Sequence, residues 1–325
     1  MSRVLIERYR DRLPVGAATP VVSLGEGSTP LVRAARLSER LGVELWLKLE
    51  LANPTGSFKD RGMTLAVSKA VEEGAPAVVV ASTGNTASSA AAYAAKAGLP
   101  ALVLTSRGTA GAKVAQARMY GARVLEVRGS FDEALAAARE LERRGTHALV
   151  NSLNPYRVQG QKTLAFELVE ELGGAPDAVA LPYGGGGNTR AVFLGFEELG
   201  SMPRLLPVQA ASRADTLASA IRIATPVHAD EVAEAVGRSD GRVLTASDDE
   251  IVRAWQTLAV EEGVFCEPSS AASLAGVEKA GLPRGSRVVC VVTGHGLKDP
   301  TLAAEHAAQP TEVDSDLDSI LEAAQ

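Results

Sequence analysis

Short apolar runs alternate with longer amphipathic runs along most of the chain. The apolar runs are rich in Val and Leu and nearly continuous, which is typical of strands buried on both faces. We expect strands at 77–81, 100–104, 123–127, 147–151, 178–182, 205–210 and 287–293. Helical runs separate them, and this alternation predicts an α/β fold in which helices cover a parallel sheet.

Several helix boundaries can be read from local signals. In 130–145 and 247–263 a Ser is followed three residues later by a Glu, which is the capping-box pattern, and each segment ends at a Gly. The segment 86–97 is rich in Ala and Ser, so its helix can lie very close to a sheet. The acidic segment 309–325 has Pro310 near its start and is expected to be a loosely attached tail or a short helix.

Composition narrows the class of protein. The chain has 325 residues, enough for about two domains, and its 33 Lys and Arg against 39 Asp and Glu give a net charge of −6. We therefore expect no nucleic-acid partner. Apolar runs stay far below the ~20 residues that a membrane span requires, and two cysteines form neither a disulfide framework nor a zinc set. With no signal-peptide core at the start, we expect a cytoplasmic protein without membrane partners.

The first candidate site is the segment 53–62, Asn-Pro-Thr-Gly-Ser-Phe-Lys-Asp-Arg-Gly, where a helix is expected to begin near Ser57. Lys59 would then lie in the first helical turn, where the positive end of the helix dipole lowers the pKa of an amine. A neutral amine is what a Schiff-base lysine requires. A surface lysine that points outward is the simpler interpretation, and the residues alone leave both open.

Two strand-to-helix turns can bind anions. Residues 82–86, Ser-Thr-Gly-Asn-Thr, follow the strand 77–81 and offer hydroxyl and N–H groups, although the same residues also make ordinary capped turns. Four consecutive glycines and Asn188 follow the strand 178–182. Ordering four glycines costs much conformational entropy. Their presence is explained if several backbone N–H groups must converge on an anion. A flexible surface loop is the alternative, and neither a Walker A loop nor a dinucleotide fingerprint is present.

Two more polar segments follow strands. Thr293 can offer its hydroxyl to a buried ring nitrogen, and His295 is either a general base or, as we favour, a structural residue. Arg157 can clamp a phosphate or carboxylate, or form a surface ion pair. The remaining histidines lack metal-ligand spacing, so we expect no metal site.

Taken in order, these segments resemble the fold-type II pyridoxal-phosphate enzymes, the family of tryptophan synthase β, cysteine synthase, threonine dehydratase and threonine synthase. The resemblance extends over about residues 20–302. Within that family the motifs are most similar to the shorter, bacterial and archaeal threonine synthases, on the segments 27–31, 53–63, 81–95, 151–163 and 293–300.

The resemblance implies two domains, each with a mostly parallel sheet flanked by helices, and an active site in the cleft between them. A large domain that binds the cofactor phosphate would comprise 1–52 and 151–308. A small mobile domain would comprise 53–150, and 309–325 would be an acidic tail. It also implies a homodimer.

The resemblance further implies roles for individual residues. For the cofactor, pyridoxal 5′-phosphate, these are Lys59 as the Schiff-base and catalytic residue, Asn85 at the ring hydroxyl, Thr293 at the pyridine nitrogen, and Gly184, Gly185, Gly186, Gly187 and Asn188 at the phosphate. For the substrate they are Ser82, Thr83, Asn85 and Thr86 at the α-carboxylate, and Ser152 and Arg157 at a phosphate.

The implied reaction converts O-phospho-L-homoserine and water into L-threonine and phosphate. One position departs from the pattern, because threonine synthases often carry Asn where this chain has Gly185. Four glycines are more typical of the dehydratases, so a threonine/serine dehydratase is the alternative enzyme. A catalytically silent binding protein on the same fold is a third possibility, which the retained Lys59 disfavours.

Overall fold

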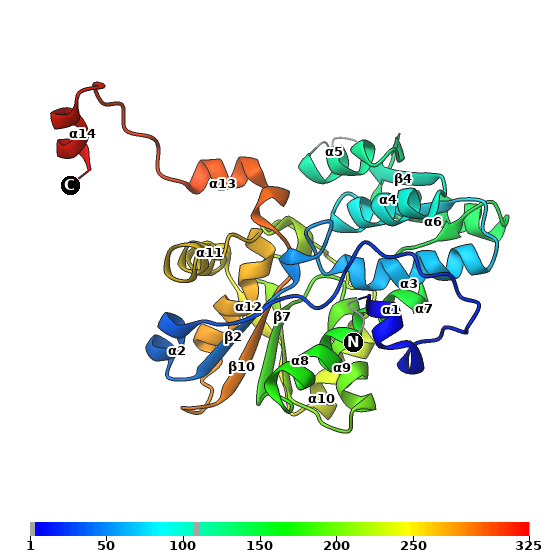
Figure 1. Ribbon diagram of the computed structural model, residues 1–325, viewed down its shortest axis with the longest axis horizontal. Helices are drawn as coiled ribbons and strands as arrows, with labels where there is room; N and C mark the ends of the chain where they lie inside the picture. The colour runs from blue at the N-terminus through cyan, green and yellow to red at the C-terminus, as the bar shows by residue number, and fades with distance from the viewer. Residues whose placement is uncertain (1–3, 107–110, 325) are drawn as a thin grey trace.

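The computed structural model describes residues 4–106 and 111–324 and contains two β-sheets. A six-stranded sheet has the order β1-β2-β10-β7-β8-β9, and a four-stranded sheet has the order β5-β4-β3-β6. In Figure 1, β2, β10 and β7 mark the first sheet and β4 marks the second. The strands are β1 (Leu31–Arg33), β2 (Glu44–Leu49), β3 (Val78–Ala81), β4 (Ala101–Ser106), β5 (Arg123–Val127), β6 (Ala148–Leu149), β7 (Ala178–Pro182), β8 (Arg204–Ala210), β9 (Leu244–Ala246) and β10 (Arg287–Val292).

Helices connect and cover the strands. They are α1 (Leu5–Arg8), α2 (Ala35–Leu41), α3 (Lys59–Glu72), α4 (Asn85–Ala97), α5 (Ala112–Met119), α6 (Phe131–Arg143), α7 (Pro155–Gln161), α8 (Thr163–Leu172), α9 (Gly187–Glu198), α10 (Ala229–Arg238), α11 (Asp248–Glu262), α12 (Pro268–Lys279), α13 (Pro300–His306) and α14 (Leu317–Ala323). Single 3₁₀ turns lie at Glu50–Ala52, Ser219–Ile221 and Gly296–Lys298, among others.

The six-stranded sheet is buried on both faces. Its strands run parallel except β1, which pairs antiparallel with β2. Alternate residues of β7 face opposite sides: Ala178 and Ala180 pack in the cluster that contains α11 and α12, whereas Val179 and Leu181 pack with α8 and α9. This period of two is why the strand reads as a continuous apolar run.

The four-stranded sheet is parallel throughout. Its side chains also alternate between two buried faces. Val78 and Val80 of β3 pack with α3 and α4, and Val79 packs with α6 on the other face. Most alanines of α4 are buried against this sheet, as its composition predicted. Small side chains let the helix axis approach the strands closely.

Each strand expected from the sequence is present, although β6 is only two residues long. The capping boxes at Ser130 and Ser247 are also confirmed. The sequence reasoning missed β1, β2 and β9. Two of these have three residues each, and β2 interrupts its apolar positions with Glu44 and Lys48, so none gives a continuous apolar run.

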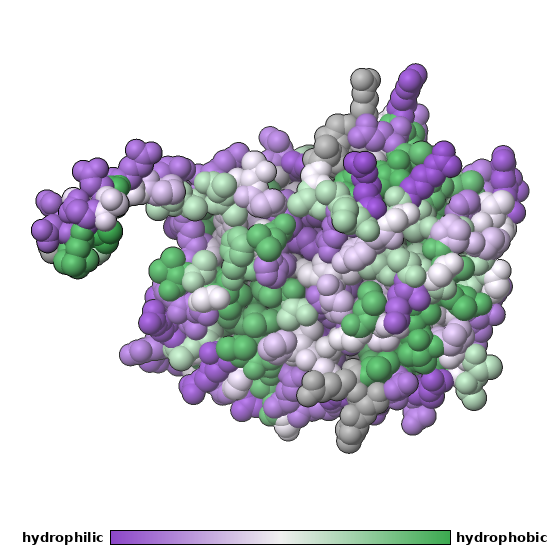
Figure 2. Space-filling model, turned by 45° about the horizontal axis from the view of Figure 1, so that its top comes forward, coloured by the Kyte–Doolittle hydropathy of each residue, from purple (hydrophilic) through white to green (hydrophobic). Residues whose placement is uncertain are grey.

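The chain after α13 leaves the body of the molecule. It extends as an arm that carries the exposed helix α14, whose apolar side chains form the green patch at the end of the arm in Figure 2. In the described part of the chain, no helix combines the length and the apolar character needed to cross a bilayer.

Candidate active site

Polar segments from both sheets meet at the carboxyl ends of their strands. The segment after β3 touches the start of α12, because Asn85 Nδ2 donates to Glu267 Oε1 at 2.8 Å. The segment before α3 touches the end of β10, because the Phe58 N–H donates to Thr293 O at 3.0 Å. Parallel sheets bind ligands at this edge, so the gathered segments form a candidate site.

Lys59 is the first residue of α3, as the sequence predicted. Its side chain is half-buried, and Nζ lies 4.2 Å from the centre of the Phe58 ring. Burial, together with the nearby Arg157 guanidinium, lowers the pKa of Lys59 to about 7, and Glu267 opposes this shift. A large fraction of the amine is therefore neutral near pH 7, as a nucleophilic lysine requires.

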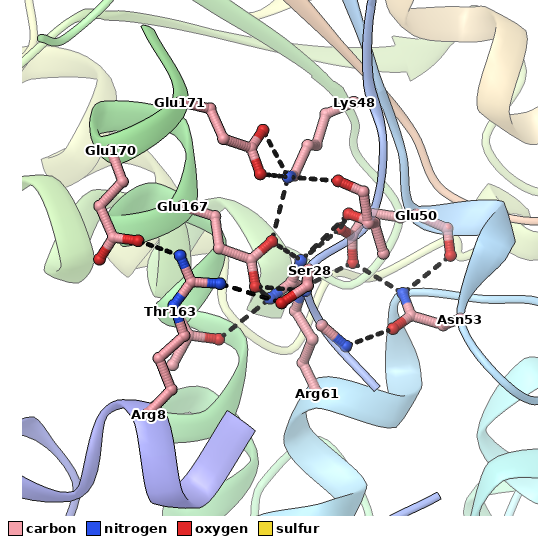
Figure 3. A network of polar contacts seen from close by, with 12 residues as sticks. Arg8, Ser28, Lys48, Glu50, Asn53, Arg61, Thr163, Glu167, Glu170 and Glu171 are labelled. Atoms are coloured by element: carbon pink, nitrogen blue, oxygen red, sulfur yellow. Dashed lines mark hydrogen bonds and ion pairs between the residues drawn. The ribbon is translucent and has the colours of Figure 1, made fainter. Parts of the chain in front are cut away.

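A buried charge network fixes the first turn of α3 (Figure 3). Arg61 donates to both oxygens of Glu50, each at 2.7 Å, and to both oxygens of Glu167, at 2.7 and 2.6 Å. Lys48 Nζ lies 3.0 Å from Glu167 Oε2. Burial alone would raise the pKa of Glu167, but Arg61 and Lys48 outweigh it and hold the pKa at about 2. The network anchors the turn that carries Lys59 to elements beside the six-stranded sheet.

Asp60 anchors the same turn to α4. Its carboxylate accepts from Thr55 N at 2.7 Å, Thr55 Oγ1 at 2.6 Å and Ser89 Oγ at 2.6 Å. Burial raises the pKa of Asp60 to about 6 despite these bonds. The sequence reasoning gave Asp60 no role, because its partner Ser89 lies on another helix.

The turn after β3 combines a buried amide with accessible hydroxyls. Asn85 is buried, and its Oδ1 has no hydrogen-bond partner among the residues described. Ser82, Thr83 and Thr86 are half-buried around the start of α4. The unpaired amide oxygen and these hydroxyls fit a ligand with both donor and acceptor groups, such as the ring hydroxyl of a cofactor and a substrate carboxylate.

Other segments of the chain pack closely against the glycine turn, which lies between β7 and α9. A Cβ on Gly184 would lie 3.1 Å from Ile221 Cα, and one on Gly186, whose φ is +90°, would lie 2.8 Å from Val232 Cγ2. Only glycine fits such positions without displacing backbone or a packed side chain. A flexible surface loop is therefore the wrong interpretation of this turn.

Unpaired donors line the same turn. Asn188 Nδ2 and Thr189 Oγ1 are buried and lack hydrogen-bond partners within the described chain, where no side chain caps the start of α9 either. Buried donors are normally paired, so these point to an absent acceptor. A helix N-terminus with free donors fits the phosphate of pyridoxal phosphate.

Thr293 and His295 follow β10. Thr293 is buried, and its Oγ1 lies 2.9 Å from Ser270 Oγ, so it presents a neutral hydroxyl. That environment suits the pyridine nitrogen of the cofactor. His295 Nδ1 accepts from Leu297 N at 3.1 Å and so caps the 3₁₀ turn Gly296–Lys298, which supports the structural interpretation.

Arg157 is buried at 1% exposure, so it is not part of a surface ion pair. Its Nη1 donates to Val150 O at 3.0 Å, but Nε and Nη2 have no hydrogen-bond partner in the described residues. Burial lowers the pKa of Arg157 to about 10, which still leaves it charged at neutral pH. Ser152 is half-buried in the same segment, between β6 and α7. The buried Arg157 guanidinium, with its two unpaired nitrogens, is suited to bind an anion other than the one at the glycine turn.

Besides Asp60, two more charged residues of the site, Glu267 and Lys113, were not expected from the sequence. Glu267 precedes α12, and its Oε2 lies 3.2 Å from Lys113 Nζ on α5. Lys113 Nζ also lies 3.0 Å from Asp299 Oδ2, so it ties α5 to the start of α13. The only local signal was Pro268, which marks a helix start after Glu267.

Known proteins share this arrangement. The family model "Pyridoxal-phosphate dependent enzyme" matches residues 22–294. A threonine synthase of Synechocystis sp. is 49% identical over 94% of this chain and 86% of its own length. A threonine synthase of Mycobacterium tuberculosis is 48% identical over 95% of this chain and 93% of its own.

Solved structures agree on the fold. Maize serine racemase superposes with a TM-score of 0.78 at 22% identity, over 93% of this chain and 95% of that chain. The expected fold class is thus confirmed, and pyridoxal 5′-phosphate is the cofactor. With nearly half of its residues identical over almost the full length of both relatives, the chain belongs to the threonine synthase family of pyridoxal-phosphate-dependent enzymes.

Proposed function

We propose that this protein converts O-phospho-L-homoserine and water into L-threonine and phosphate. The observation that carries this proposal is the buried Arg157, whose two unpaired guanidinium nitrogens offer a second anion site apart from the glycine turn. A substrate with both a carboxylate and a phosphate needs such a site, whereas a dehydratase substrate has no phosphate. The identity to threonine synthases supports the same choice.

The cofactor supplies an electron sink for the charge that develops at the substrate α-carbon. We assign its binding to the residues described above: Lys59 at the reactive carbon, Asn85 at the ring hydroxyl, Thr293 at the ring nitrogen, and Gly184, Gly185, Gly186, Gly187 and Asn188 at the phosphate.

Lys59 is the proposed acid–base group. Its lowered pKa lets the amine accept the α-proton near neutral pH and then assist removal of a β-proton. The network around Arg61 keeps the amine in place by fixing the first turn of α3. Departure of phosphate from the γ-carbon, return of protons to the γ-carbon and the α-carbon, and addition of water at the β-carbon complete the conversion.

The substrate would be held at both ends. Its α-carboxylate would meet Ser82, Thr83, Asn85 and Thr86, and its phosphate would meet Ser152 and Arg157. Charge-assisted bonds to Arg157 are strong enough, at ~1.5–3 kcal/mol, to contribute substantially to selection of a phosphorylated substrate.

We also propose the domain division expected from the family, with 1–52 and 151–308 as the large domain, 53–150 as the mobile domain and 309–325 as a tail. Closure of the mobile domain would exclude water until phosphate has left. The same resemblance supports a homodimer in the cytoplasm.

Two product assays test the function. The holoenzyme should release phosphate and threonine from O-phospho-L-homoserine far faster than it forms keto acid from L-threonine. The opposite ratio would establish the dehydratase, and inactivity toward both substrates with retained ligand binding would establish a binding protein.

A further inference from the structure

His228 lies behind the glycine turn and is 2% exposed. It immediately precedes α10, and its backbone N–H donates to Gly185 O at 3.0 Å. A Cβ on Gly187 would lie 3.4 Å from Cδ2 and 3.6 Å from Nε2 of the imidazole. Both the backbone and the ring of His228 are therefore packed against the turn.

The imidazole also reaches a segment of the other sheet. Its Nε2 lies 3.2 Å from the backbone oxygen of Ser152, which follows β6. Its Nδ1 lies 3.2 Å from Glu231 Oε1. Both partners only accept hydrogen bonds, so both bonds form together only when the two ring nitrogens each carry a proton.

Two charged side chains lie beside this ring. Glu231, on α10, faces Nδ1 directly. Arg190, on α9, lies 3.2 Å from the same Glu231 carboxylate and shares it. The Glu231 carboxylate therefore stands between the Arg190 guanidinium and Nδ1 of the ring, while Nε2 faces Ser152.

This geometry connects two parts of the proposed site that lie far apart in sequence. Ser152 belongs to the segment that carries Arg157, the proposed ligand of the substrate phosphate. Gly185 belongs to the turn proposed for the cofactor phosphate, and its Cβ position faces only Ile223 Cδ1 at 3.6 Å. His228 links the two segments directly, because its backbone N–H bonds to Gly185 O and its ring bonds to Ser152 O.

We propose that His228 is a positioning residue that sets the separation between the segment carrying Ser152 and Arg157 and the glycine turn, and thereby governs affinity for the phosphate end of the substrate. This inference rests on the proposed function. The carboxylate end of the substrate is assigned to residues 82–86, which His228 does not contact, so its effect should be confined to ligands that carry phosphate.

The test uses holoenzyme with His228→Ala and His228→Gln, and the exposed His306→Ala as a matched control. We expect His228→Ala to raise KM for O-phospho-L-homoserine, and the inhibition constant of inorganic phosphate, by about tenfold, as for loss of a charge-assisted bond. The kcat, and the dissociation constant of L-threonine read from the cofactor absorbance, should stay within about twofold. Gln retains a donor for Ser152 O, so His228→Gln should recover part of the lost affinity.

The separation of KM from kcat and the partial recovery by glutamine are readouts that a purely structural role would not give. A His228→Gln variant that binds phosphate no better than His228→Ala, or a His228→Ala variant that weakens L-threonine and phosphate equally, would overturn the proposal.

Failure of the two proposals can be told apart. If the wild type forms no threonine, the proposed function is wrong, while inorganic phosphate binding measured by calorimetry still tests His228. If the wild type forms threonine and His228→Ala binds phosphate as tightly as wild type, only the positioning role is wrong.

Discussion

Arg61 and Glu167 share two hydrogen bonds, of 2.7 and 2.6 Å, although Arg61 lies on a helix of the four-stranded sheet and Glu167 on a helix of the six-stranded sheet. Both side chains are 1% exposed. The helix that carries Lys59 is therefore attached to both halves of the molecule, and the amine keeps its place beside the segments that follow β7 and β10.

Replacing Arg61 should destabilise the fold strongly. Arg61→Met leaves Glu50 and Glu167 without their main cationic partner, and breaking a buried pair in this way costs about 3–5 kcal/mol. Urea unfolding followed by circular dichroism measures the loss. Arg143→Met removes an exposed pair with Glu140 and should leave the unfolding midpoint unchanged. Equal midpoints for Arg61→Met and wild type would contradict the anchoring role.

The same network predicts sensitivity to acid. The pKa of Glu167 is about 2 in the folded protein, below its ordinary value. A depressed pKa contributes stability that is fully present above the unfolded-state pKa and is lost as the pH falls towards the folded value. Unfolding free energy should therefore decline between about pH 5 and pH 2, and Glu167→Gln should flatten that decline. An identical acid profile in Glu167→Gln would show that other carboxylates account for it.

Arg157→Ala should raise KM for O-phospho-L-homoserine by at least about tenfold, because the lost charge-assisted contact is worth ~1.5–3 kcal/mol. Arg144→Ala, which changes an exposed arginine, is the control. Steady-state kinetics with phosphate release give both values. An unchanged KM would remove Arg157 from the substrate site.

Gly186→Ala should weaken cofactor binding. The alanine would have to adopt φ near +90°, which costs ~1–2 kcal/mol, and its Cβ would meet Val232. Equilibrium titration of apoenzyme with pyridoxal phosphate should show a dissociation constant raised about tenfold. Gly174→Ala, at a site with open space and no positive φ, should bind as wild type. Normal binding by Gly186→Ala would place the cofactor phosphate elsewhere.

Much of the fold could be predicted because strands buried on both faces leave continuous apolar runs, as in β3, β7 and β10. The short β1 and β9 and the mixed β2 leave no such run. They are held by pairing with neighbours, as when Val289 of β10 aligns with Trp46, and that pairing has no local signature.

The candidate site likewise contains some residues that the sequence reveals and others that it does not. Lys59 and the glycine turn stand out in sequence because their chemistry is local: an amine at a helix start, and glycines where a Cβ would clash. Glu267 and His228 gain their meaning from partners far along the chain. Asn85 is 182 residues from Glu267, and Ser152 is 76 residues from His228, so only the fold brings these pairs together.

Borohydride reduction of the holoenzyme, followed by peptide mass spectrometry, tests whether Lys59 carries the cofactor. The reduced cofactor should be found on the peptide that contains Lys59. Lys59→Ala should lose the absorbance band of the lysine-bound cofactor, and the exposed Lys96→Ala should keep it. A reduced adduct on any other lysine would show that Lys59 is not the residue that binds the cofactor.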